Sequence, residues 1–162
     1  ELDTPDNATA WLIAQGLAPE GTGLLSYCQQ QLEGLRADLR RILGSHTEGS
    51  APAPSALEGL NRALTAVPSA APLHYSPGAG LERVHTHSLS RIVAHAMAQI
   101  AEDAAGLLTG PDAGRLASCA AAPCDRFLIR THARRHWCSE RCGARQRANR
   151  SYARKLEKAR VD

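Results

Sequence analysis

Four of the five cysteines in this 162-residue chain lie near its C-terminal end as two short-spaced pairs. Cys119 pairs with Cys124 and Cys138 with Cys142, and thirteen residues separate the two pairs. This spacing lets four thiolates surround one tetrahedral Zn²⁺ ion at about 2.3 Å each. Two disulfides are the alternative, but the chain opens at Glu1 without an export leader, and a reducing cytosol favours metal binding. We therefore predict one structural zinc ion held by these four cysteines.

The cysteine-containing segment has too little apolar surface to fold by itself, so zinc is expected to supply much of its folding energy. We predict a knuckle at residues 119–124, a two-stranded hairpin of residues 127–129 and 135–137, and a final helix that opens at residues 138–142. This order is similar to that of a treble-clef zinc finger. The four-residue step between the last two cysteines places both thiolates on one helix face, where they can converge on the metal.

Other side chains near the predicted zinc site have less direct roles. Phe127 and Trp137 are expected to cover the metal rather than to contact a ligand. His132 and His136 are alternative zinc ligands, since either lies near enough in sequence to replace one of the cysteines.

Cys28 lies far from the two cysteine pairs, in an apolar helical pattern, and is predicted to be a small core residue.

Charge divides the chain near residue 114 into two unlike segments, which we predict to be two domains. Residues 1–114 hold twelve acidic and six basic side chains, whereas residues 115–162 hold four acidic and thirteen basic side chains. A strongly basic segment without a wide apolar face favours a nucleic acid over a membrane as partner. No apolar run approaches the roughly 20 residues of a membrane helix. A solvated surface helix is the alternative explanation of the basic segment.

Basic residues continue beyond the last cysteine on a predicted helix. Four of them fall at spacings of three and four and share one face: Arg147, Arg150, Arg154 and Lys158. The same helix has a narrower, weakly apolar stripe that can dock on the first domain, formed by Ala148, Tyr152, Leu156 and Ala159. Arginine predominates over lysine, which favours forked contacts to phosphate and to guanine edges. The residues predicted to contact nucleic acid are Arg130, Arg134, Arg135, Arg141, Arg145, Arg147, Arg150, Arg154, Lys155 and Lys158.

Apolar periodicity predicts a mainly α fold for residues 1–114. Aromatic residues are only 4% of the chain, so the core must consist of Leu, Ala, Ile and Val, which suits packed helices better than a β-sandwich. Thr4 is expected to cap the first helix and Ser55 the third, whereas Gly44 is expected to end the second. The predicted elements are helices at residues 5–15, 25–43, 55–67 and 88–109, the last of them central, and a short hairpin of residues 73–76 and 81–85.

No residue pattern in the chain points to catalysis. There is no Gly-x-Ser-x-Gly elbow, no phosphate-cradling glycine loop and no pair of carboxylates on an apolar background. His85, His87 and His95 lack a carboxylate or cysteine at ligand spacing, so neither a second metal nor an active site is predicted there. A contact with an unidentified ligand is the alternative for these histidines. We predict that the protein is not an enzyme.

The order of motifs in the basic segment resembles the CGNR zinc finger. The matching motifs are Cys119-Ala-Ala-Ala-Pro-Cys124 with the apolar Phe127-Leu-Ile, then Arg134-Arg-His-Trp137-Cys138-Ser139, then Cys142-Gly143-Ala144-Arg145. The preceding residues resemble the ABATE domain that accompanies this finger. That likeness rests on an early Trp-Leu helix, a long Leu-rich helix with arginines, a Leu-Asn-Arg62 motif and an Ala-rich last helix.

Two departures from the finger pattern affect its chemistry. Only three residues separate Cys138 from Cys142, one fewer than is usual in the family, and Ala144 replaces the usual asparagine. The shorter spacing still lets both thiolates reach one metal. The missing asparagine removes a side chain that could hold the knuckle or read a base.

The resemblance implies a bacterial, stress-linked transcription regulator that is cytoplasmic and nucleoid-associated. Its helical domain would sense a ligand or mediate assembly, and its zinc finger would contact DNA. Further possible partners are a second copy of the chain, in a homodimer, and RNA polymerase or other transcription machinery. Two alternatives remain: a module that docks on an acidic protein, and a switch in which oxidation of the four thiolates ejects zinc and releases DNA.

Overall fold

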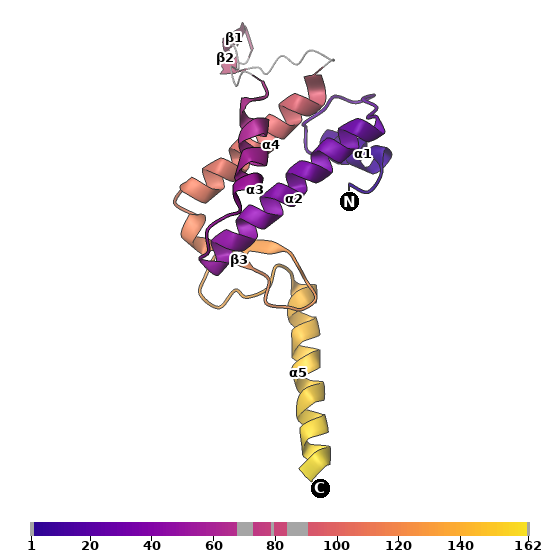
Figure 1. Cartoon of the computed structure of the whole chain (residues 1–162), viewed down its shortest axis with the longest axis vertical. Coiled ribbons are helices and arrows are strands. Elements are labelled where there is room, and N and C mark those ends of the chain that lie inside the picture. Colours follow the sequence, from indigo (N-terminus) through magenta and orange to yellow (C-terminus); the bar gives the residue numbers. More distant parts are fainter. Residues whose placement is uncertain (1, 68–72, 79, 84–90, 162) are drawn as a thin grey trace.

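The protein is mainly α, as predicted, and a computed structural model describes residues 2–67, 73–78, 80–83 and 91–161. Four helices form a helical body, and a small finger with one projecting helix follows them (Figure 1). The elements are α1 (Pro5–Ala14), α2 (Ser26–Glu48), α3 (Pro54–Thr65), β1 (Leu73–Ser76), β2 (Gly80–Arg83), α4 (Ile92–Thr109), a 3-10 turn (Ala113–Arg115), β3 (Leu116–Ser118), β4 (Phe127–Ile129) and α5 (Glu140–Val161). Among the described residues, no helix is long and apolar enough to span a membrane.

The first helix begins and ends where its sequence predicts. The Thr4 hydroxyl accepts a hydrogen bond from the Asn7 N–H at 3.2 Å, and Pro5 occupies the first helical position. Gly16 follows the helix with φ of 68°, and the Leu17 N–H donates to the Leu12 carbonyl at 2.8 Å. This pattern is a Schellman motif, which requires a left-handed residue and therefore favours glycine.

Three predicted boundaries are wrong. The second helix does not end at Gly44 but continues to Glu48, because the left-handed terminating residue is Gly49 with φ of 70°. Ser55 does not cap the third helix; Pro54 is already helical and the residue before it takes the cap position without a side-chain bond. The second strand of the hairpin, β2, begins one residue before the predicted start of 81, since Gly80 with φ of 79° already pairs with β1; the predicted residues 84 and 85 lie outside the described ranges.

Several predictions lie outside the described residues or at the edge of the body. Residues 88–90 and both His85 and His87 are outside the described ranges, so α4 is described from Ile92. Cys28 is half-buried rather than a core residue, and Leu25, the first residue of the predicted second helix, is 74% exposed. Leu25 is the N-cap residue of α2, and Cys28 lies in the first turn of the helix.

The core of the body consists of two neighbouring apolar clusters. One joins α1, α2 and α4 around Leu12, which is fully buried, and the other joins α2, α3 and α4 around Leu60. Met97 and Ile100 pack against both clusters. The helix that carries them, α4, therefore packs against both clusters, but it shares the predicted central position with α2, which contributes Leu32 to one cluster and Leu35 to the other.

The C-terminal half of α2 also holds the finger against the body. A ring nitrogen of His46 lies 2.8 Å from the Ala113 carbonyl oxygen, and the hydroxyls of Thr47 and Ser118 lie 2.9 Å apart. Arg40 reaches the finger from two turns earlier and forms an ion pair with Asp125 at 2.6 Å. Because all these contacts come from the C-terminal half of one helix, α2 links the core of the body to the finger.

The close packing of α2 against α3 depends on Gly59. A methyl group at this position would overlap the Asp38 carboxylate of α2, whereas the space around Gly34, in the interior of α2, is open. We expect Gly34→Ala to stabilise the protein by about 0.5–1 kcal/mol through helix propensity. Gly59→Ala should lose that gain to overpacking, so that the two variants differ by about 1–3 kcal/mol in free energy of unfolding. Urea denaturation measures both; equal stabilisation would contradict this account of the interface.

Candidate metal centre and nucleic-acid interface

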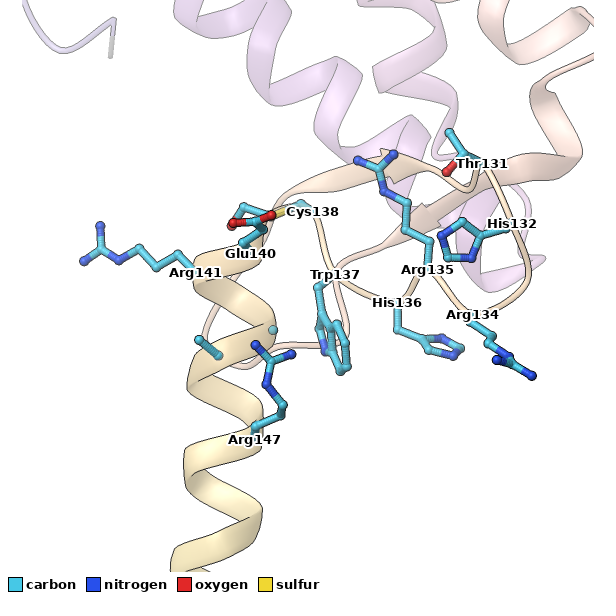
Figure 2. Close-up of a pocket in the computed structure, with 13 residues that line it drawn as sticks. Thr131, His132, Arg134, Arg135, His136, Trp137, Cys138, Glu140, Arg141 and Arg147 are labelled. Carbon is cyan, nitrogen blue, oxygen red and sulfur yellow. The ribbon is translucent and has the colours of Figure 1, made fainter.

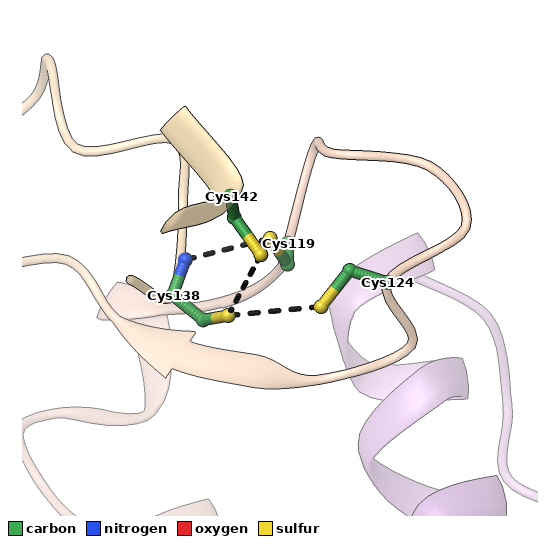
Figure 3. A group of neighbouring side chains, drawn as sticks. All are labelled: Cys119, Cys124, Cys138 and Cys142. Carbon is green, nitrogen blue, oxygen red and sulfur yellow. Dashed lines mark hydrogen bonds between the residues drawn. The ribbon is translucent and has the colours of Figure 1, made fainter. Parts of the chain in front are cut away.

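The four clustered cysteines meet in the finger with the geometry of a tetrahedral zinc site (Figure 3). Their Sγ atoms all lie within 4.8 Å of one another. Two of the separations are 3.6 Å, between Cys124 and Cys138, and 3.7 Å, between Cys138 and Cys142. Four thiolates at about 2.3 Å from a common centre lie roughly 3.8 Å apart, so the arrangement fits one zinc ion.

The knuckle that presents the first two cysteines is closed by a β-hairpin. Strands β3 and β4 pair antiparallel, with Ser118 opposite Phe127, so that residues 119–126 form the connecting loop. The Cys119 N–H donates to the Arg126 carbonyl at 2.8 Å, and the Cys124 N–H donates to the Ala121 carbonyl at 2.8 Å. This ladder fixes the direction of both side chains.

The predicted pairing of residues 127–129 with residues 135–137 is therefore wrong. The partner of β4 is β3, which directly precedes the first cysteine. Residues 131–137 form a loop instead, with bends and a turn at 131–134, and the Ala120 N–H donates to the His136 carbonyl at 2.9 Å. This segment reverses the direction of the chain and brings Cys138 back to the knuckle, where the Cys138 N–H donates to the Cys119 sulfur at 3.4 Å.

The start of α5 presents the other two cysteines. The Ser139 hydroxyl accepts the Cys142 N–H at 3.3 Å, which is the bond of an N-terminal cap. The hydroxyl of Ser139 also lowers the pKa of the Cys142 thiol to about 7. Burial, followed by hydrogen bonds with the other three cysteines, raises the pKa of the Cys138 thiol to about 12. Since zinc binds thiolates, metal binding at neutral pH must displace the proton of Cys138.

Two side chains of α5 fasten the helix to the knuckle. The Arg145 guanidinium donates to the Ala121 carbonyl at 2.9 Å and lies 3.8 Å from the Cys142 sulfur, and the Gln146 amide donates to the Ala120 carbonyl at 3.3 Å. A cation beside a sulfur ligand offsets the negative charge of a four-thiolate zinc site. Arg145, predicted to contact nucleic acid, thus has a partner within the finger.

Trp137 covers the metal centre as predicted, but Phe127 does not. Trp137 packs against the finger core that contains Cys119 and Cys142, and a methyl group at Gly143 would lie only 3.0 Å from its ring. Phe127 faces the body, where the Arg40 guanidinium lies 5.8 Å from its ring centroid. It alternates with Leu128 along β4, and Leu128 is the residue that joins the finger core.

Neither His132 nor His136 joins the metal ligands in the described structure. The ligand group consists of four cysteines alone. The His136 ring lies edge-on to Trp137, with 6.2 Å between the ring centroids. Both histidines line an open groove on the outer surface of the finger.

This basic groove has a volume of about 880 Å³ and lies between the turns of residues 131–137 and the first turns of α5 (Figure 2). Four of the predicted nucleic-acid contacts line it: Arg134, Arg135, Arg141 and Arg147. Glu140 is the one acidic residue in its lining. None of the four arginines forms an ion pair within the described part of the chain; Arg134, Arg141 and Arg147 are exposed, and Arg135 is half-buried.

The other predicted contacts extend from the groove along α5 or lie apart from it. Arg150, Arg154 and Lys155 are exposed on α5, and Arg130 is exposed at the end of β4. Lys158 belongs to α5, but its side chain is outside the described residues. The predicted docking of the apolar stripe on the body is wrong: Tyr152 is 66% and Leu156 50% exposed. The helix leaves the finger and projects away from the body, so only its first turns are packed (Figure 1).

Comparison with known families agrees with this two-part arrangement. Residues 1–111 match the ABATE family, which is described as "putative stress-induced transcription regulator". The chain belongs to the ABATE family. Residues 115–155 of this ABATE protein match the CGNR zinc finger, so its four cysteines form one structural zinc site. No curated protein matches the chain.

The residues that join the ABATE body to the finger were not found from the sequence. Arg40 and Asp125 carry no motif of their own, and Arg40 lies 85 residues before its partner. The position of Asp125 directly after a zinc-ligating cysteine was the available signal. Its partner could be identified only once α2 was known to reach the finger.

Zinc binding is expected to depend on the clustered cysteines alone. Cys138→Ser should lose zinc and the structure of the finger, because metal binding supplies the folding energy of such a small unit. Cys28→Ser is the matched control and should retain one zinc ion per chain. Metal content and near-ultraviolet circular dichroism of Trp137 report both properties. Retention of zinc and finger structure by Cys138→Ser would contradict the four-cysteine site.

The contact between Arg145 and the knuckle leads to a separate expectation. Arg145→Gln should weaken zinc binding by about tenfold, since side chains that support metal ligands typically contribute that much to affinity. Arg150→Gln, on the exposed part of the same helix, should leave zinc affinity unchanged. Competition with a chromophoric chelator measures both affinities. Equal affinities in the two variants would show that Arg145 does not support the metal site.

Proposed function

We propose that this ABATE protein is a transcription regulator whose zinc finger binds duplex DNA through the basic groove and α5. The observation that carries the proposal is a cluster of arginines without ion-pair partners among the described residues, on two segments that border one groove. Arg134 and Arg135 come from the turns before Cys138, and Arg141 and Arg147 from the helix after it. Guanidinium groups without acidic partners favour phosphate, which they bind through paired hydrogen bonds.

The shape of α5 supports duplex DNA as the polyanion. Its 22 residues extend roughly 33 Å, and it projects as a single exposed helix. A free helix of this kind fits the major groove of B-form DNA. Asn149 is exposed next to the arginines and is a candidate for base contacts, whereas Gln146 already bonds the knuckle. The phosphate contacts would set affinity, and base contacts would set sequence preference.

The helical body serves in this proposal as a sensor or assembly domain, without enzymatic activity. Its net negative charge keeps it away from DNA and leaves binding to the finger. The contacts of α2 with the finger provide a direct mechanical connection between the two parts. A cytoplasmic location follows from a DNA target in a bacterial cell.

Salt-dependent binding of labelled duplex DNA, measured by fluorescence anisotropy, tests the proposal. If six basic residues contact phosphates, the logarithm of the affinity should fall against the logarithm of salt concentration with a slope of about −5. Reversal of three charges on α5, as Arg147→Glu, Arg150→Glu and Arg154→Glu together, should weaken binding at low salt by roughly 100-fold or more. Arg62→Glu, exposed on α3, is the control.

Two results would contradict the proposal. The zinc-loaded protein could fail to bind any duplex at low salt, in which case the basic groove and helix would serve an acidic protein partner instead. The triple variant could also bind as tightly as the unaltered protein, which would place the DNA contact elsewhere.

A further inference from the structure

A second cavity lies where the helical body meets the finger. Its volume is about 440 Å³, within the range of sites for small molecules. Trp11 of α1, Leu35 and Leu39 of α2, Ile100 of α4 and Phe127 of β4 provide apolar walls. Both parts of the protein therefore contribute to one concave apolar surface.

The polar residues of this cavity are all arginines. Arg36 and Arg40 belong to α2 and Arg126 to the finger, and no acidic residue lines the cavity. Arg40 is already engaged, since it pairs with the Asp125 carboxylate at 2.6 Å and donates to the Asp125 carbonyl at 2.7 Å. Arg36 and Arg126 are exposed and form no ion pair within the described ranges.

We propose that this cavity binds a small apolar molecule with one carboxylate, such as an aliphatic or aryl acid. The apolar part would lie against Trp11 and the leucines of α2, and the carboxylate would bind Arg36 and Arg126. Two unpaired guanidinium groups beside an apolar surface complement that combination of properties. A carboxylate–guanidinium pair of the same kind is present at this junction, between Asp125 and Arg40.

Occupancy of this cavity is linked to the seating of the finger on α2. A ligand that contacts Trp11 and Arg36 on one side and Phe127 and Arg126 on the other binds only while these parts are together. It therefore stabilises the seated arrangement by mass action. This step rests on the proposed function: the cavity is the effector site through which the body influences DNA binding by the finger.

The zinc-loaded full chain provides the direct test, with decanoate and 1-naphthoate as probes and 1-decanol as the uncharged control. Calorimetry should give one carboxylate bound per chain, and the fluorescence of Trp11 should change; Trp11→Phe should abolish that change. Arg36→Ala with Arg126→Ala should weaken binding of the carboxylate by about tenfold, the usual size of a lost charge-assisted contact, and leave 1-decanol unaffected. Arg62→Ala, outside the cavity, should leave carboxylate affinity unchanged.

Three results would overturn the proposal. They are no binding of either carboxylate up to about 1 mM, equal affinity for decanoate and 1-decanol, and unchanged affinity in the double arginine variant. DNA binding by the same preparations separates this proposal from the preceding one. Carboxylate binding without DNA binding would support the cavity and reject the regulator, whereas DNA binding without carboxylate binding would do the reverse.

Discussion

The convergence of four thiolates on one metal is the constraint on which the functional part of this protein depends. The finger has two strands of three residues and one projecting helix, and its apolar core contains two of the cysteines themselves. Such a unit cannot form a stable core without the metal. The zinc site therefore fixes the direction of α5 and the path of the turns before it, and with them the basic groove that lies between.

The metal centre and the basic groove share a single short stretch of helix. Within the first two turns of α5, Cys142 is a metal ligand, Arg145 bonds the knuckle, and Arg141 and Arg147 border the groove. Neighbouring positions on a helix point in different directions, so one helix can serve the metal on one side and a polyanion on the other. Any disturbance of the metal site should therefore alter the groove as well.

The helix α2 has a comparable double role on the other side of the finger. Its buried leucines belong to both clusters of the body core, and its last three turns bear Arg40, His46 and Thr47, which contact the finger. The ion pair of Arg40 is largely exposed, and exposed pairs contribute little stability by themselves. The junction is held by several modest contacts, which suits a connection that responds to a ligand.

The sequence allowed prediction of those features that local chemistry decides. Cysteine spacing identified the metal ligands, and the Thr4–Pro5 and Gly16 signals fixed both ends of α1. Contacts between distant segments could not be derived in this way. The predicted partner of β4 is wrong because strand pairing depends on which segment closes the knuckle. The predicted docking of α5 is wrong because a weak apolar stripe does not reveal whether another surface packs against it.

The most direct test of the account is the salt dependence of DNA binding by the protein with and without its zinc. The account predicts tight, steeply salt-dependent binding by the zinc-loaded protein. It also predicts much weaker binding after chelation, because the turns and α5 then no longer present their arginines to one groove. Equal binding in the two states would mean that α5 acts only as an unstructured basic tail, and absence of binding by the zinc-loaded protein at low salt would contradict the DNA-binding role itself.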